Sequence, residues 1–200
     1  MGIKISHVAI YKWVKGFGYI FKEIVSKYTP KNLSSSDDWH VDETVIKIAS
    51  KRYYIWTLID SETRYVLDWY LTTSREAASA FHLFSKVKEN YGAPAMIVSD
   101  RLPSYSIPTK VIFDSSKHIK VQSWFDETTN NLIESFFKRF KHKYKTCHGL
   151  KVESSVQTLL EDFFFFYNYI RPHSGLNNET PARVAGVKYS ELQRVNLFLM

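Results

Sequence analysis

The chain has 200 residues, of which 44% are hydrophobic and 16% aromatic. This composition excludes the disordered and collagen-like classes and suits one domain with small attachments. The formal charge of +7 weakly favours a polyanionic partner. The single cysteine, Cys147, excludes an internal disulfide and fits a reducing cytoplasm.

The first 38 residues have the sequence features of short helices and a linker, whereas the main domain begins after them. Residues 6–18 have the apolar spacing of an amphipathic helix. A second helical stretch ends before Pro30, and residues 31–38 have the composition of a linker. We therefore expect a short helical segment over residues 1–30 and a main domain that begins near Asp38.

The next segments predict a β-meander followed by a helix and a buried strand. Residues 39–48, 52–60 and 64–72 are rich in Val, Ile, Tyr, Trp and Thr, which is typical of strands. Apolar residues over 74–91 recur at helical spacing. Residues 95–99 are almost wholly apolar, as expected for a buried central strand.

The remainder of the chain predicts a loop, two short strands and two long helices. The loop covers residues 101–109, and the short strands are expected at 110–113 and 118–122. The helices are expected at about 128–146 and 153–170. Strands that precede strand–helix units indicate an α/β fold, a mixed sheet with helices packed on its faces.

Three acidic residues lie where such a fold could bring them together. Asp42 lies in a strand, Asp100 directly follows the buried strand, and Glu134 lies in a helix. Mg²⁺ prefers oxygen ligands, and two-metal phosphoryl transfer needs carboxylates from several elements. Most acids are simply solvated, and Asp60 and Asp68 are alternatives, although Asp60 also fits a turn.

The helix around Glu134 points to nucleic acid. Its apolar stripe consists of Ile133, Phe136, Phe137, Phe140 and Tyr144. A second stripe about a quarter-turn away consists of Glu134, Lys138, Lys141 and Lys145. Lysines in a row beside a carboxylate suit a phosphate track next to a metal site. An ordinary i, i+4 pair of Glu134 with Lys138 would explain part of the pattern equally well.

Four stretches together resemble the DDE transposases of bacterial and archaeal insertion sequences, especially insertion-sequence family 6. They are Trp39-His-Val-Asp-Glu-Thr-Val-Ile-Lys, Ile97-Val-Ser-Asp100, Asn130-Asn-Leu-Ile-Glu134-Ser-Phe-Phe-Lys-Arg-Phe-Lys141, and Tyr167-Asn-Tyr-Ile-Arg-Pro-His-Ser-Gly-Leu176 with Thr180-Pro-Ala. The resemblance extends from about residue 4 to residue 187. The combination is specific, although no single stretch is.

The resemblance implies an RNase H-like (retroviral integrase-type) fold over residues 38–187. It implies that Asp42, Asp100 and Glu134 are the catalytic triad and bind Mg²⁺, as two ions, with Mn²⁺ as a substitute. It also implies that Lys141, seven residues after Glu134, contacts DNA at the transposon end. The other basic residues of this helix, Lys138, Arg139 and Lys145, are expected to bind DNA with it. The implied reaction is hydrolysis at the element's end, followed by attack of the freed 3′-OH on target DNA.

The start of the chain departs from this family. Residues 6–18 resemble the recognition helix of a helix-turn-helix, but only five residues precede Ser6, too few for the partner helix. We therefore expect residues 1–30 to be a partial DNA-binding segment and 188–200 a tail. A simple packing helix over residues 6–18 is the alternative.

The sequence leaves two other functions open. One is a truncated, catalytically silent DNA-binding remnant that modulates full-length transposase, and the other is an RNase H-like nuclease without strand transfer. The expected partners are double-stranded DNA, as transposon ends and target, and a second copy of the chain, because two ends must be paired. The expected location is the cytoplasm of a prokaryote, in association with the nucleoid.

Overall fold

A computed structural model of the chain describes residues 6, 28–31, 33, 37–121, 130–146 and 152–189. The chain divides into two compact units, Pro30–Glu153 and the combination of Met1–Thr29 with Ser154–Met200. Nearly all of the segment predicted to be a partial helix-turn-helix lies outside the described residues, as does most of the predicted tail.

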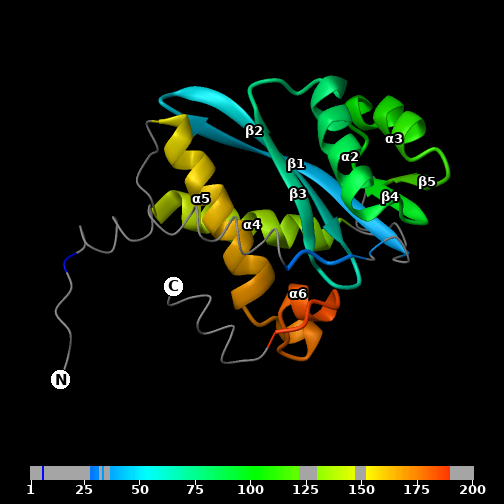
Figure 1. Ribbon diagram of the computed structural model, residues 1–200. Coiled ribbons are helices and arrows are strands. Elements are labelled where there is room, and N and C mark those ends of the chain that lie inside the picture. Colours follow the sequence, from blue (N-terminus) through cyan, green and yellow to red (C-terminus); the bar gives the residue numbers. More distant parts are fainter. Residues whose placement is uncertain are drawn as a thin grey trace. The chain divides into compact units, whose positions relative to one another are not determined.

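The larger unit begins with the predicted antiparallel meander. Strands β1 (Asp38–Ile48), β2 (Lys51–Asp60) and β3 (Val66–Thr72) follow one another in the chain (Figure 1). Ala49 and Ser50 connect β1 to β2, and both have positive φ. A two-residue hairpin turn matched to the twist of its strands requires this backbone conformation. The predicted meander is therefore confirmed.

Two short parallel strands complete a mixed sheet. They are β4 (Met96–Ser99) and β5 (Lys117–Lys120), and the strand order is β3-β2-β1-β4-β5. Strand β1 pairs antiparallel with β2 and parallel with β4. Val41 is opposite Ser99 in the parallel pair. The residues directly after these two, Asp42 and Asp100, are therefore placed at the same level of the sheet.

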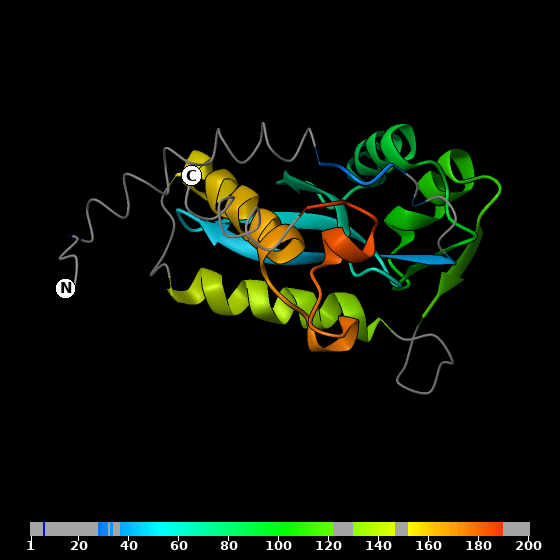
Figure 2. The same ribbon diagram turned by 60° about the horizontal axis from the view of Figure 1, so that its bottom comes forward.

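Helices cover both faces of this sheet. Helices α2 (Ala77–Tyr91) and α3 (Ser106–Ile112) lie on one side, and α4 (Asn131–Thr146) lies on the other (Figure 2). The predicted apolar stripe of α4 is confirmed over Ile133, Phe136, Phe137 and Phe140, which are all buried. The predicted mixed sheet with flanking helices is confirmed.

Aromatic side chains fill the core on the α2 side of the sheet. The Phe113 ring lies 5.9 Å from the Trp39 ring and 5.3 Å from the Phe84 ring, measured between centroids. The Tyr105 ring packs edge-on against Trp56 at 5.4 Å. All five side chains are fully buried. Edge-to-face pairs of this kind stabilise a core beyond the area that they bury.

The segment after β4 corrects the sequence prediction. The sequence predicts a loop over 101–109 and a strand over 110–113, but the chain forms a 3₁₀ turn, η1 (Pro103–Tyr105), followed directly by α3. Pro103 is at the start of η1, and Pro108 lies in the first turn of α3. Backbone N–H groups in a first turn have no helical partner, so proline does not interrupt the helix there.

The described part of the other unit is helical. Helix α5 (Glu153–Phe165) continues as a π-helical turn, η2 (Phe166–Ile170), so the helix predicted over residues 153–170 is confirmed. A 3₁₀ turn, η3 (Ser174–Leu176), and a short helix, α6 (Pro181–Val184), come next in the chain. Within the described ranges, no helix is long and apolar enough to cross a membrane.

Candidate active site

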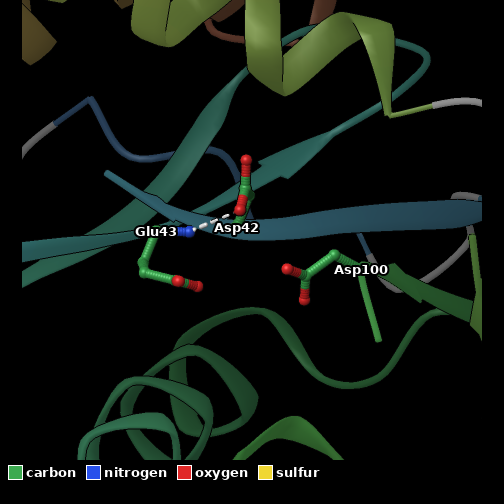
Figure 3. A group of neighbouring side chains, drawn as sticks. All are labelled: Asp42, Glu43 and Asp100. Carbon is green, nitrogen blue, oxygen red and sulfur yellow. Dashed lines mark hydrogen bonds between the residues drawn. The ribbon is translucent and has the colours of Figure 1, made fainter. Parts of the chain in front are cut away.

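The sheet brings two of the three predicted acidic residues together. Asp42 lies within β1, and Asp100 directly follows β4. One carboxylate oxygen from each of Asp42, Glu43 and Asp100 lies within 4.8 Å of the other two (Figure 3). The parallel pairing of β1 with β4 brings Asp42 and Asp100 together, because it places Val41 opposite Ser99 and these two acids directly follow that pair.

The acidic group formed by Asp42, Glu43 and Asp100 includes side chains from both faces of β1. Asp42 and Glu43 point to opposite sides of the strand, and Asp42 points toward α4 (Figure 3). Successive strand residues alternate in this way. Glu43 and Asp100 lie on the side of α2. Asp42 is therefore the member of the group that can share a ligand with side chains on α4.

The environment of Asp42 disfavours its negative charge. Burial, together with the charges of Glu43, Asp100 and Glu134, raises the pKa of Asp42 to about 8. Its Oδ1 accepts one hydrogen bond, from the backbone N–H of Glu43 at 2.8 Å, which does not offset the other effects. A divalent cation would remove this conflict, and carboxylate oxygens are its preferred ligands. The donor set therefore fits a hard metal ion such as Mg²⁺.

Glu134 lies near these three carboxylates but is not one of them. It lies in the first turn of α4 and is exposed. Its charge acts on Asp42, but its carboxylate is not among those within 4.8 Å of one another. The structure thus brings Asp42 and Asp100 together and leaves Glu134 as a nearby side chain on the opposing helix.

His40 connects the strand of Asp42 to the start of the helix that carries Glu134. Its Nδ1 lies 3.1 Å from the side-chain oxygen of Asn130, and its Nε2 donates to Asp38 at 2.8 Å. Asn130 in turn accepts the backbone N–H of Glu134 on its carbonyl at 3.1 Å. His40 and Asn130 are both buried. This arrangement agrees with a structural role for His40.

Sequence reasoning did not single out Glu43. Its side chain is only 3% exposed, and both of its carboxylate oxygens are bonded. Oε1 accepts from Nε of Arg75 at 2.7 Å and also from Nη2, and Oε2 accepts from the hydroxyl of Tyr105 at 2.6 Å. The sequence signal that could have identified Glu43 is its position next to Asp42 inside a strand, because two adjacent strand residues place one carboxylate on each face of the sheet.

The two alternative acids are excluded from the group. Asp60 is buried and accepts the backbone N–H of Thr63 at 2.8 Å, as a turn residue does. Asp68 forms an ion pair with Lys86 at 2.6 Å. Among the described residues, the acidic group that could hold a metal consists of Asp42, Glu43 and Asp100.

The predicted basic residues of α4 are all exposed. They are Lys138, Arg139, Lys141 and Lys145. Helical geometry places Lys138, Lys141 and Lys145 on roughly the same side of α4 as Glu134, whereas Arg139 lies farther around the helix. A row of cations therefore extends from Glu134 along α4.

Comparison with known proteins gives a family match over most of the chain. A family model described as a DDE domain (DDE_Tnp_IS240) matches residues 36–173. This stretch contains Asp42, Glu43, Asp100 and Glu134.

Curated relatives from Staphylococcus aureus are similar over most of their length. A transposase for the insertion sequence-like element IS431mec is 28% identical over 166 residues, which cover 83% of this chain and 72% of the relative. A transposase for insertion sequence element IS257 in transposon Tn4003 shows the same identity and coverage.

Solved structures show the same fold at low sequence identity. The catalytic core domain of HTLV-2 integrase in complex with magnesium, in a trimeric form, has a TM-score of 0.57 at 16% identity, covering 77% of this chain and 99% of that one. A chain of the simian T-cell lymphotropic virus intasome has a TM-score of 0.61 at 16% identity, covering 80% of this chain and 57% of that one. The fold is that of the integrase catalytic core, and the predicted RNase H-like fold is confirmed.

Proposed function

The chain belongs to the DDE transposase family, metal-dependent enzymes of DNA transposition, and from this premise we propose that Asp42, Asp100 and Glu134 are its metal-binding catalytic residues. The observation that carries this proposal is the position of Asp42. Its carboxyl is buried among other acids, and together these raise its pKa to about 8. Such a group is unfavourable for a metal-free protein and is suited to a bound cation.

Asp42 and Asp100 would supply carboxylate oxygens to Mg²⁺ from two adjacent strands. Two such ions, when bound, would activate the attacking oxygen and stabilise the leaving one during in-line displacement at phosphorus. Mn²⁺ also accepts carboxylate ligands, so we expect it to substitute for Mg²⁺. The parallel pairing of β1 with β4, in which Val41 is opposite Ser99, supports this proposal because it sets the two residues that follow side by side.

Glu134 is a better third ligand than Glu43, although Glu43 is closer to the two aspartates. Both oxygens of Glu43 already accept strong hydrogen bonds from Arg75 and Tyr105. A metal would have to displace these donors, one of them a cation. Glu134 is exposed, and Asp42 points toward its helix. A cation bound to Asp42 would be attracted to Glu134 without loss of an existing contact.

The basic residues of α4 would bind the DNA backbone beside this site. Lys138, Lys141 and Lys145 continue the helix face of Glu134, and Arg139 adds a fourth exposed cation. Each phosphate contact releases counterions and fixes the position of the duplex without reading its sequence. We propose that these residues guide a transposon end so that its scissile phosphate reaches the acidic group.

The proposed reaction has two steps and needs no covalent protein–DNA intermediate. In the first, water attacks phosphorus at the element's end and the 3′-oxygen leaves with a proton, which frees a 3′-OH. In the second, that 3′-OH attacks a target phosphodiester in line and displaces the target strand's own 3′-oxygen. Two ends must be paired, so we propose a homodimer or a larger assembly.

We also propose a division of the chain into three parts. Residues 38–187 would form the catalytic domain, with residues 1–30 as a partial DNA-binding segment and 188–200 as a tail. We expect the protein to act on the nucleoid in the cytoplasm.

The test compares the wild-type protein with Asp42→Asn, Asp100→Asn and Glu134→Gln on labelled element ends in Mg²⁺ or Mn²⁺. We expect cleavage and strand transfer by the wild type and none above background by the variants. Equal cleavage by wild type and Asp100→Asn would refute the metal role. Binding without cleavage by the wild type would favour a silent remnant, and cleavage without strand transfer would favour a nuclease.

A further inference from the structure

The two side chains of the ion pair between Glu43 and Arg75 differ greatly in solvent exposure. The Glu43 side chain is 3% exposed, whereas the Arg75 side chain is 48% exposed. Two N–H groups of Arg75 point at one oxygen of Glu43. The glutamate is therefore fixed inside the protein, and the arginine is held by one edge while much of its side chain remains in contact with solvent.

Several buried contacts fix the position of Glu43. The Tyr105 hydroxyl donates to its other oxygen at 2.6 Å, and the Tyr105 ring is fully buried against Trp56 and Phe84. Ser104, the neighbour of Tyr105, donates to the backbone carbonyl of Arg75 at 2.7 Å. The segment before α2, strand β1 and turn η1 are thus joined around one carboxylate.

Arg75 keeps donors for another ligand. A guanidinium has five N–H donors, and Glu43 occupies those of Nε and one of Nη2. Within the ranges that the structure describes, Nη1 has no hydrogen-bond partner. The charge of Asp100 also acts on Arg75, after the stronger effects of Glu43. The free edge of the guanidinium is therefore a cationic group at the border of the acidic site.

We propose that Arg75 binds a DNA phosphate next to the acidic site and that Glu43 is a positioning residue that aims it. The proposal rests on the proposed DNA-cleaving function. Charge supports it, because a polyanion that approaches three carboxylates is repelled unless a cation stands beside them. An arginine pre-oriented by a buried carboxylate also loses little side-chain entropy when it binds phosphate. This contact is separate from the row of cations on α4.

The experiment measures how binding to a short duplex of unrelated sequence depends on salt. Ca²⁺ replaces Mg²⁺, because it binds carboxylates in a larger and more flexible geometry, so DNA can enter the site while two-metal chemistry is disfavoured. Log K is plotted against log salt concentration for the wild type, Arg75→Gln and Arg75→Lys. A single phosphate contact contributes about 0.9 to this slope.

Lys88→Gln is the matched control. Lys88 is also about half exposed and also has a carboxylate partner, Asp114 at 3.5 Å. It lies in the last turn of α2, whereas Arg75 precedes the first turn. At 1.5 Å per residue the two positions are roughly 20 Å apart. Loss of one positive charge at Lys88 is therefore expected to leave the slope unchanged.

Arg75→Gln alone leaves Glu43 buried without its cation, so the double variant Glu43→Gln/Arg75→Gln is measured as well. If Arg75 contacts phosphate, both variants lose about 0.9 from the slope. Arg75→Lys is expected to keep the wild-type salt slope, because the positive charge remains. It is expected to bind DNA more weakly, because an ammonium cannot form the paired hydrogen bonds of a planar guanidinium. A wild-type slope in the double variant would overturn the proposal and leave Arg75 as the neutralising partner of Glu43.

These outcomes are independent of the test of catalysis. Asp100→Asn that abolishes cleavage, together with a wild-type slope for the double variant, would refute only the role of Arg75. Cleavage by Asp100→Asn together with a reduced slope for Arg75→Gln would refute only the catalytic proposal.

Discussion

Replacement of Asp42 by asparagine is expected to stabilise the metal-free protein. An asparagine side chain at this position would keep the shape of the aspartate and would carry no charge into the acidic group. In the wild type the pKa of Asp42 is about 8 in the folded chain, compared with an ordinary value of 3.8. The folded protein therefore holds a proton on this carboxyl at pH 7 that the unfolded chain releases.

The magnitude follows from proton linkage. One pKa unit corresponds to about 1.4 kcal/mol, and pH 7 is about three units above the unfolded value, so this carboxyl costs roughly 4 kcal/mol at neutral pH. The folded state binds the extra proton between about pH 4 and pH 8, so the stability of the wild type falls as the pH rises through that window. Asp42→Asn removes this dependence, with about 4 kcal/mol as the upper limit of its gain.

Urea denaturation in the presence of a chelator, from pH 5 to pH 8, measures both effects. The matched control is Asp114→Asn, since the Asp114 side chain is 75% exposed and its charge is not among those that raise the pKa of Asp42. Asp42→Asn should gain stability relative to wild type most strongly near pH 8, and Mg²⁺ should stabilise the wild type more than Asp42→Asn. Equal or lower stability of Asp42→Asn at pH 7 in chelator would show that the acidic surroundings of Asp42 do not destabilise the metal-free protein.

Three further variants test the surroundings of the site. His40→Ala should cost about 1–3 kcal/mol in urea denaturation, because it removes the ring that contacts the side chain of the buried Asn130 and one oxygen of the half-buried Asp38; an unchanged midpoint would contradict this. Tyr105→Phe should cost about 1–3 kcal/mol by the same measurement, since it removes a hydrogen bond to a buried carboxylate while the ring remains. Lys141→Gln should lower the salt slope of DNA binding by about 0.9, and a wild-type slope would exclude a phosphate contact there.

The elements that the sequence predicts correctly are those whose pattern is local. The hairpin strands are rich in β-branched and aromatic residues, β4 is a short apolar run, and α4 has an apolar stripe at helical spacing. A few neighbouring residues determine each of these signals. The prediction is wrong for the segment after Asp100, because its prolines suggest breaks. In the structure both prolines lie at the starts of helical turns, where proline is compatible with the helix.

The site was predictable to a different degree for each residue. Asp100 could be selected because it directly follows a buried strand, and parallel pairing then determines its distance from Asp42. Glu43 could not be selected in this way, because its role depends on Arg75 and Tyr105, which are 32 and 62 residues away in the chain. Contacts between distant segments of this kind leave no local pattern in the sequence.

In the proposed function, Asp42, Asp100 and Glu134 hold the catalytic metal. The most direct test of this claim is a crystal grown with Mn²⁺, in which anomalous scattering locates the ions without reference to activity. The claim predicts a peak bound by carboxylate oxygens of Asp42 and Asp100, with Glu134 as a ligand of this ion or of a second one beside it. A peak held by Glu43 with Arg75 displaced, or no peak at Asp42 and Asp100, would contradict it.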